Sequence, residues 1–309
     1  MGPFSRSLSI LIYHRVVPEP DPLILDQVCA KEFDWQLATL RRWFTVLPLR
    51  EGIERVRTGT LPPRAACVTF DDGYADNVTV ALPVLRRHGV HATFFVATGF
   101  LDGGRMWNDS VIETLRAAQG DALDARMLGL DALSISNMDS RRSAVDKALA
   151  ALKYLPQEER QKRVDEFSAQ APRPLPSDLM MTADQVRQLR EGGMEIGGHT
   201  VTHPILARLD AERAAGEILD GKRRLEEITG KQVSLFAYPN GKPVRDYREE
   251  HVGLVRRLGF EAAVSTAWGV ARRSSDTFQL PRFTPWDRTP GKFALRLLRN
   301  TFRGKPELA

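Results

Sequence analysis

Several short polar segments of the sequence carry residue types that bind metal ions or move protons. Asp71 and Asp72 follow an apolar run and precede a glycine. His199 and His203 stand four residues apart, and His14 follows another apolar run. One carboxylate oxygen and two imidazole nitrogens suit Zn²⁺, and also Co²⁺ or Ni²⁺. Three protein ligands leave a coordination position open for water, which is typical of a catalytic metal site, and the second aspartate is then free to act as a base.

Each of these segments also has a simpler interpretation. An Asp-Asp-Gly after a strand is often a turn in which an aspartate caps the next helix. A lone histidine such as His14 is more often a core residue with its hydrogen bonds satisfied, and the segment 238–241, Tyr-Pro-Asn-Gly, would by itself be a turn. Two histidines at i and i+4 are more suggestive, because one helical turn puts both on one side. The combination, rather than any single segment, favours a metal site.

The elements that must position these residues are predicted from apolar runs and helical periodicity. Short buried runs predict strands at 8–13, 66–70, 91–96, 194–197, 234–238 and 260–264. Helical periodicity predicts one helix ending at 88 and others at 211–229 and 246–258, each followed by a glycine. Thr182 and Gln185 have the capping-box spacing of a further helix start. Strands and helices therefore alternate along most of the chain.

Alternating strands and helices imply a parallel sheet covered by helices. At 309 residues, we predict an α/β fold in which this sheet closes into a β/α barrel, with a doubly wound open sheet as the alternative. In a barrel the carboxyl ends of the strands meet at one rim, where active sites are built. The segments that contain His14, Asp72, His199 and Asn240 each follow a predicted strand. We therefore expect them at the same rim.

The section from about 102 to 180 differs from the rest of the chain. It is polar, rich in arginine and in helical pattern, and it contains no convincing strand. We therefore predict a single domain over residues 1–309, with a helical insertion at about 102–180 that is not a barrel element.

The composition is that of an ordinary globular protein, with 42% hydrophobic and 27% charged residues. The net charge is +5, but no dense basic block occurs, so we expect no nucleic-acid binding. No apolar stretch approaches the roughly 18 residues that span a membrane. The apolar run at 8–12 is too short for a signal-peptide core. We expect a cytoplasmic protein, with an exported form or a peripheral membrane form left open.

The combined motifs resemble the polysaccharide deacetylase family of carbohydrate esterases, which share a NodB-like homology domain. Segment 69–73, Thr-Phe-Asp-Asp-Gly, matches the family's first motif. Segment 199–203, His-Thr-Val-Thr-His, matches the second, His-Ser/Thr-x-x-His. The resemblance covers roughly 8–101 and 181–285, and not the insertion. It implies a distorted (β/α)₇ barrel, in agreement with the alternation of elements.

The resemblance also implies a role for each matching residue. The implied metal ligands are Asp72, His199 and His203, and the implied general base is Asp71. The substrate-binding residues that we assign are Tyr238, Pro239, Asn240 and Gly241, which stand at the family's third motif, and Arg282, which matches no family motif. Within this group, the backbone N–H of Asn240 stands where the family's third motif helps to hold an oxyanion.

Two departures from the family pattern concern Arg282 and His14. The third motif usually opens with an arginine that steadies the catalytic aspartate, and this chain has Ala237 there. Arg282 could replace it, and a surface or structural arginine is the alternative. The family's late Leu-x-His motif, which supplies the general acid, is missing. In a subgroup that acts on exported poly-N-acetylglucosamine, an N-terminal Tyr-His supplies the acid; Tyr13 and His14 fit this arrangement, so His14 is the implied acid.

The implied activity is that of a metal-dependent hydrolase that removes N-acetyl groups from an amino-sugar polysaccharide or oligosaccharide and releases acetate. The expected cofactor is Zn²⁺, with Co²⁺ or Ni²⁺ as alternatives. The expected partners are the acetylated polymer and a polysaccharide assembly machinery. Hydrolysis of another C–N amide or of an O-acetyl bond is the alternative reaction. A non-catalytic carbohydrate-binding homologue is the alternative class of protein.

Overall fold

The computed structural model describes residues 6–302, 304 and 306–309. The first five residues, which precede the apolar run tested as a signal-peptide core, lie outside the described residues. The chain forms two compact units. The first comprises Val28–Asp102 and the described parts of 1–19 and 181–309, and it contains every candidate site residue. The second comprises Pro20–Gln27 and Gly103–Met180.

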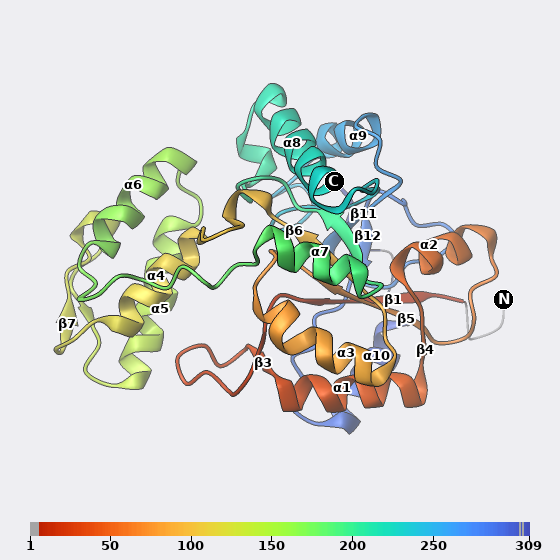
Figure 1. The fold of residues 1–309 in the computed structure, drawn as a ribbon, viewed down its shortest axis with the longest axis horizontal. Helices are drawn as coiled ribbons and strands as arrows, with labels where there is room; N and C mark the ends of the chain where they lie inside the picture. Colours follow the sequence, from red (N-terminus) through yellow and green to blue (C-terminus); the bar gives the residue numbers. More distant parts are fainter. Residues whose placement is uncertain (1–5, 303, 305) are drawn as a thin grey trace. The chain divides into compact units, whose positions relative to one another are not determined.

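Seven parallel strands of the first unit, among the described residues, form a nearly closed barrel (Figure 1). In their order around the barrel they are β1 (Leu8–Tyr13), β5 (Ala65–Phe70), β6 (Ala92–Val96), β9 (Glu195–Gly198), β10 (Leu235–Ala237), β11 (Ala262–Trp268) and β12 (Leu280–Arg282). Backbone hydrogen bonds close the circle between the ends of this series: the Ile12 N–H donates to the Phe283 carbonyl at 3.0 Å, and the Phe283 N–H donates to the Ile10 carbonyl at 2.7 Å. Three two-residue strands accompany the barrel: β2 (Val16–Val17), β3 (Val28–Cys29) and β4 (Thr45–Val46).

Side chains along each barrel strand alternate between the interior and the outer helices. One apolar cluster draws its members mainly from the strands and fills the interior, and Cys67 of β5 belongs to it. Phe70, three residues later, belongs to the other cluster, which also contains the buried faces of the helices. The same alternation directs Thr69 inward, and Asp71 follows two residues later. Apolar residues therefore fill the barrel, and polar residues follow at the carboxyl end.

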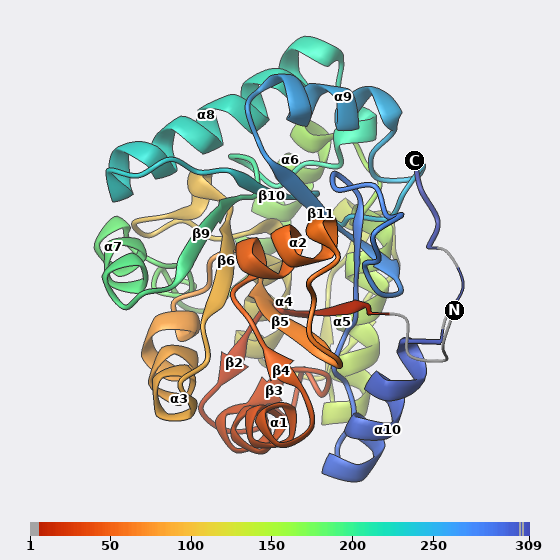
Figure 2. The same ribbon diagram turned by 90° about the vertical axis from the view of Figure 1, so that its right-hand side faces the viewer.

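The helices α1, α3, α7, α8, α9 and α10 surround the strands, and α2 lies in front of them in Figure 2. Their bounds are α1 (Ala30–Trp43), α2 (Leu49–Thr58), α3 (Leu82–His88), α7 (Ala183–Glu191), α8 (Ala211–Thr229), α9 (Glu249–Arg257) and α10 (Pro290–Asn300). In α8, the buried stripe includes Ala214, Ile218 and Leu225. Thr182 caps α7 by accepting a hydrogen bond from the Gln185 N–H, as the capping-box spacing predicts.

The second unit is helical and carries one small antiparallel ladder. Its helices are α4 (Trp107–Ala117), α5 (Met138–Leu152) and α6 (Gln157–Ser168), and they share a separate apolar cluster. Its paired strands are β7 (Ala122–Leu123) and β8 (Leu133–Ser134). The expectation of no strand in this section is therefore wrong. Two dipeptides are too short to produce a recognisable alternation of apolar and polar residues.

The predicted barrel is confirmed, and the contact between β12 and β1 excludes the open doubly wound sheet. The bounds of β1 and α8 are those predicted at 8–13 and 211–229. β11 continues to Trp268, beyond its predicted end at 264. The prediction ended too early because the polar residues Ser265 and Thr266 interrupt the apolar run. None of the described helices combines the length and the apolar character that crossing a membrane requires.

Candidate active site

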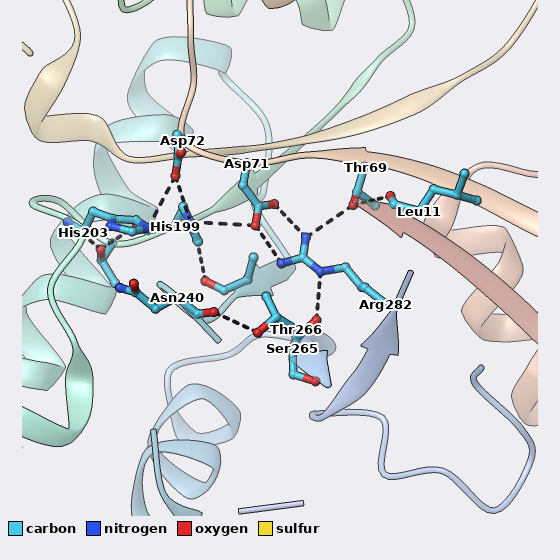
Figure 3. Close-up of polar contacts among 12 residues, drawn as sticks. Leu11, Thr69, Asp71, Asp72, His199, His203, Asn240, Ser265, Thr266 and Arg282 are labelled. Carbon is cyan, nitrogen blue, oxygen red and sulfur yellow. Dashed lines mark hydrogen bonds and ion pairs between the residues drawn. The ribbon is translucent and has the colours of Figure 1, made fainter. Parts of the chain in front are cut away.

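The candidate residues lie at the carboxyl ends of barrel strands. Asp71 follows β5, and His199 follows β9, which only β6 separates from β5. Asn240 comes after β10, and His14 comes after β1. In Figure 3 the aspartates of the first motif and the histidines of the second point toward one another. The barrel therefore brings these two motifs together at one rim.

Asp72, His199 and His203 form a compact set of possible ligand atoms. Asp72 Oδ1 lies 3.4 Å from the Nε2 atom of each histidine. One ligand atom from each residue lies within 4.8 Å of the others. Within the described part of the chain, the buried Asp72 Oδ1 has no hydrogen-bond partner. An unsatisfied buried carboxylate oxygen is costly, and a divalent cation among these atoms would satisfy it, so the set fits a metal ion.

The two imidazoles are suited to act as nitrogen ligands. His199 Nδ1 lies 2.7 Å from the carbonyl oxygen of Ala237 at the end of β10. Because a carbonyl oxygen only accepts hydrogen bonds, Nδ1 carries a proton and Nε2 faces the site. Burial lowers the pKa of His203 to about 4, which keeps its imidazole neutral at neutral pH. A neutral imidazole is the form that binds a metal ion.

The carboxylates make this centre attractive to positive charge. Burial opposes the ionisation of Asp72, but the neighbouring histidines hold its pKa below the usual range. Burial also opposes the charged form of His199, yet Asp72 and Asp71 raise the pKa of His199. A proton on His199 Nε2 and a cation at the centre therefore compete for the same lone pair, so binding of the ion releases the proton.

Asp71 lies beside this set and is paired with Arg282. The guanidinium donates two hydrogen bonds to the carboxylate, 2.7 Å from Nη1 to Oδ1 and 2.6 Å from Nη2 to Oδ2. Burial opposes the ionisation of Asp71, but the charge of Arg282 lowers its pKa, and His199 and His14 add to this effect. Asp71 is therefore a carboxylate at neutral pH. Its Oδ2 lies 4.0 Å from His199 Nε2.

Arg282 lies below the aspartate, inside the barrel (Figure 3). Its side chain is 0% exposed. Its Nε donates to the Ser265 carbonyl oxygen at 2.9 Å, and its Nη1 also donates to the Thr69 hydroxyl at 3.3 Å. A guanidinium without access to solvent cannot contact a polymer. Its grouping with substrate-binding residues is therefore corrected: Arg282 contacts the barrel wall and Asp71, and the second contact is the one expected of a replacement for the missing third-motif arginine.

Tyr238 also belongs to the core and not to the rim. Its side chain is fully buried and stacks on Tyr247, with 3.9 Å between the ring centroids. Its hydroxyl donates to the carbonyl oxygen of Phe278 at 3.0 Å. The structure therefore does not bring the Tyr238 side chain to the candidate site, which corrects its grouping with substrate-binding residues.

Pro239, Asn240 and Gly241 form a tight turn after β10. The Gly241 N–H donates to the Pro239 carbonyl oxygen at 2.6 Å, and Asn240 has a left-handed backbone with a φ of 58°. The Thr266 hydroxyl donates to the Asn240 carbonyl oxygen at 2.8 Å (Figure 3). These contacts fix the backbone of the turn at the end of the strand next to β9.

His14 is exposed, and its loop is tied to the segment that follows the first motif. Asn77 Nδ2 donates to the His14 carbonyl oxygen at 2.8 Å. The Asp76 carboxylate accepts hydrogen bonds from the Val16 N–H at 3.2 Å and from Arg15 Nε at 2.7 Å. The loop that carries His14 and the loop that carries the two aspartates are thus fixed to each other.

Left-handed backbone conformations gather at the site. The described residues other than glycine with a positive φ are Arg64, Asp72, Asp102, Thr200, His203, Asn240 and Val244. Four of these seven belong to the motif segments: Asp72, Thr200, His203 and Asn240. Each such residue costs about 1–3 kcal/mol and persists only where its surroundings determine its conformation. The site is therefore built from strained loops that other residues must hold.

The sequence analysis missed residues that hold the site in place by bonding Arg282, the loop of His14 or the loop between the two histidines. They are Thr69, Asp76, Asn77, Glu217 and Ser265. Most of them contact residues far away in the chain, so spacing gives no signal for them. Glu217 is the exception, since the sequence gives a signal for it: it stands three residues after Ala214 and four before Gly221, in the buried stripe of α8. A charged residue inside such a stripe indicates a specific partner.

Comparison with known proteins adds a family match to this geometry. Residues 58–125 and 143–263 match the family described as polysaccharide deacetylase. The chain is also similar to YxkH of Bacillus subtilis (strain 168), which is provisionally named a polysaccharide deacetylase. The two are 21% identical over 277 residues, which are 89% of this chain and 70% of YxkH.

Solved structures share the fold at low sequence identity. The Streptococcus pyogenes deacetylase PplD in complex with acetate has a TM-score of 0.64 and 20% identity, covering 96% of this chain and 99% of that one. IcaB from Ammonifex degensii has a TM-score of 0.61 and 20% identity, covering 95% of this chain and 97% of that one. These similarities extend over both units of the chain and support the barrel assignment.

Proposed function

Since the chain belongs to the polysaccharide deacetylase family, we propose that it is a metal-dependent hydrolase that removes N-acetyl groups from an amino-sugar polysaccharide or oligosaccharide and releases acetate. The observation that carries this proposal is the buried ion pair of Asp71 and Arg282 beside the set Asp72, His199 and His203. It supports a carboxylate base held next to a cation site, which is what water attack on an amide requires.

Asp72, His199 and His203 would hold the ion, with Zn²⁺ as the proposed metal and Co²⁺ or Ni²⁺ as alternatives. When bound, the ion polarises the acetyl carbonyl and makes water easier to deprotonate. The chain itself supplies one carboxylate and two oriented imidazoles. Because His199 must lose a proton to bind, we expect the affinity for the ion to rise with pH through the raised pKa of His199.

Asp71 would take the proton of the attacking water as its oxygen adds to the acetyl carbon. The two hydrogen bonds from Arg282 keep the Asp71 carboxylate ionised and fix its orientation. Once the Asp71 carboxyl is protonated, Arg282 attracts it less strongly. The ion pair therefore favours release of the proton that Asp71 has accepted.

Asn240 and His14 would complete the hydrolysis. The Asn240 N–H would donate a hydrogen bond to the carbonyl oxygen as negative charge develops there. His14, in its protonated form, would give its proton to the sugar nitrogen as the C–N bond breaks. The products are acetate and a free amino sugar. The Tyr13-His14 resemblance supports a polymer of the poly-N-acetylglucosamine type as substrate and an assembly machinery for that polymer as partner.

The stoichiometry of the products tests this proposal. Zinc-loaded protein is incubated with N-acetylglucosamine oligomers, with an O-acetylated sugar and with a small amide such as acetanilide, and acetate and free amine are measured. We expect acetate and amine in equal amounts from the oligomers. Acetate from the O-acetylated sugar alone, or hydrolysis of the small amide alone, would assign another bond to the site. Binding of oligomers without any acetate would assign a binding protein.

Replacement of His14 by alanine should affect amide and ester substrates differently. Amine departure needs a proton, so we expect kcat for the oligomers to fall by about 10²–10⁴-fold. Nitrophenolate leaves without a proton, so hydrolysis of 4-nitrophenyl acetate should change little. His91→Ala is the matched control, since His91 is exposed at the opposite end of β6 and bonds the Gly193 carbonyl. Equal losses on both substrates, or no loss on the oligomers, would contradict the acid role of His14.

A further inference from the structure

The loop between the two histidines has a strained backbone. Thr200 and His203 have φ values of 67° and 53°, in the left-handed region that side chains with a Cβ rarely adopt. Both residues must keep these conformations if the two imidazoles are to meet Asp72. Each costs about 1–3 kcal/mol, so the loop needs contacts that offset this cost.

Glu217 of α8 supplies the most concentrated set of these contacts. Its Oε2 accepts hydrogen bonds from two successive backbone groups, the Val201 N–H at 2.9 Å and the Thr202 N–H at 2.8 Å. Its Oε1 accepts from the Thr202 hydroxyl at 2.5 Å. Hydrogen bonds to a carboxylate are shorter and stronger than those between neutral groups. One side chain thus holds the two residues immediately before His203.

The packing of α8 allows this contact. Gly221 stands one turn after Glu217, directly against Thr200. A Cβ at Gly221 would lie 2.8 Å from the carbonyl carbon and oxygen of Thr200, so only a glycine lets the helix approach this closely. The Thr98 and Gly99 N–H groups bond the loop at the Thr200 and Val201 carbonyls, at 3.2 and 2.8 Å. The loop is therefore bonded by its N–H groups to α8 and by its carbonyls to the segment after β6.

The orientation of His203 depends directly on this loop. Its backbone N–H donates to the Thr200 hydroxyl at 3.1 Å, which ties the two left-handed residues together. The imidazole of His199, by contrast, has a second anchor in the Ala237 carbonyl. Loosening the loop should therefore displace His203 more than His199.

We propose that Glu217 is a positioning residue of the candidate metal centre: by bonding the backbone between the two histidines, it presets His203 for the ion. This inference rests on the proposed function, in which the ion is held by Asp72, His199 and His203. Residues that do not touch the metal but hydrogen-bond to its ligands orient those ligands, and removing such a residue weakens metal binding by about 10–100-fold. Glu217 would do so through the backbone and not through an imidazole.

The test measures zinc affinity on metal-free protein by competition with a chromophoric chelator, so it does not depend on activity. We expect Glu217→Ala to bind zinc about 10–100-fold more weakly than wild type. Glu217→Gln should lose less, because the amide oxygen can still accept from the two N–H groups. Glu227→Ala on the same helix is the matched control, since Glu227 is exposed and its ion pair with Arg224 is long, at 3.5 Å. Gly221→Ala should also weaken zinc binding, because its new Cβ would push against the backbone of Thr200 in the same loop.

Thermal unfolding of the metal-free variants separates positioning from simple stabilisation. A Glu217→Ala protein that unfolds at lower temperature but binds zinc like wild type would overturn the proposal. If Glu217→Ala does not fold, Gly221→Ala decides: zinc affinity equal to that of wild type, in a variant whose new Cβ displaces the loop, overturns the proposal. A wild-type protein that binds no zinc overturns the proposed function and this inference together. Zinc binding by wild type with no effect of Glu217 overturns this inference alone.

Discussion

Replacement of Asp71 by asparagine should lower kcat for acetate release by about 10²–10⁴-fold while the protein still binds its ion. Asparagine has nearly the same shape as aspartate but cannot accept the proton of the attacking water. The proposed ligands Asp72, His199 and His203 are unchanged in this variant. Metal content by elemental analysis and kcat on N-acetylglucosamine oligomers are measured on the same sample.

The controls for Asp71→Asn concern folding and charge. The substitution leaves the buried guanidinium of Arg282 without its anion, so thermal unfolding must show that the variant is folded at the assay temperature. Asp220→Asn makes the same substitution on the surface of α8, where the Asp220 side chain is 66% exposed, and it should leave the activity at the wild-type level. An Asp71→Asn protein with wild-type kcat would remove Asp71 from the mechanism.

Replacement of Arg282 by methionine should destabilise the fold by about 3–5 kcal/mol at neutral pH, because it leaves a buried carboxylate unpaired. Arg282 is 0% exposed and bonds Asp71 through two nitrogens, so water cannot take its place. Arg282→Lys keeps the charge but not the paired geometry, and we expect a smaller loss. Denaturant unfolding at neutral pH measures both. Arg288→Met is the surface control, since its pair with Glu32 is partly exposed and worth at most about 1 kcal/mol.

The same variant should change the dependence of stability on pH. In wild type, the pKa of Asp71 is lower in the folded state, so its ion pair stabilises the fold above the unfolded pKa of about 3.9 and this contribution is lost as pH falls through the folded value. In Arg282→Met, burial without a partner raises the pKa of Asp71 above 3.9. The difference in free energy of unfolding between the two proteins should therefore shrink between pH 7 and pH 4. A difference that stays constant with pH would show that lost packing, and not the ion pair, is responsible.

Local patterns account for much of the fold. The run 8–13 is apolar apart from Ser9 because β1 is buried on both sides, and the predicted bounds are those of the strand. The pattern of α8 ends at Gly230, whose left-handed backbone terminates the helix. The start predicted for α9 at 246 was too early: Asp246 accepts from the Lys242 N–H in the preceding loop, and the helix begins at Glu249. A local hydrogen bond of this kind is not visible in hydrophobic periodicity.

The candidate site was predictable in its chemical groups but not in its architecture. The strand-end positions of Asp71 and His199 follow from the barrel, since parallel strands end at one rim. The place of Arg282 inside the barrel follows from the alternation of side chains along β12, in which Leu280 also points inward. The sequence analysis predicted no strand here, so it had no reason to place Arg282 inside and grouped it with substrate-binding residues. The hydrogen bonds of Glu217 and the left-handed backbone of Thr200 arise only when α8 meets the histidine loop. The place of Glu217 in the buried stripe of α8 indicates that it has a partner, but the sequence does not show that this partner is the histidine loop.

The most direct test of the central claim is acetate release by protein stripped of metal with a chelator and then titrated with zinc. N-acetylglucosamine oligomers are the substrate, and free amine is measured alongside acetate. The account predicts no release from stripped protein and full recovery when zinc reaches the concentration of wild-type chains, with neither binding nor recovery in His203→Ala. Undiminished release by fully stripped protein, or full recovery in His203→Ala, would contradict a metal-dependent deacetylase built on Asp72, His199 and His203.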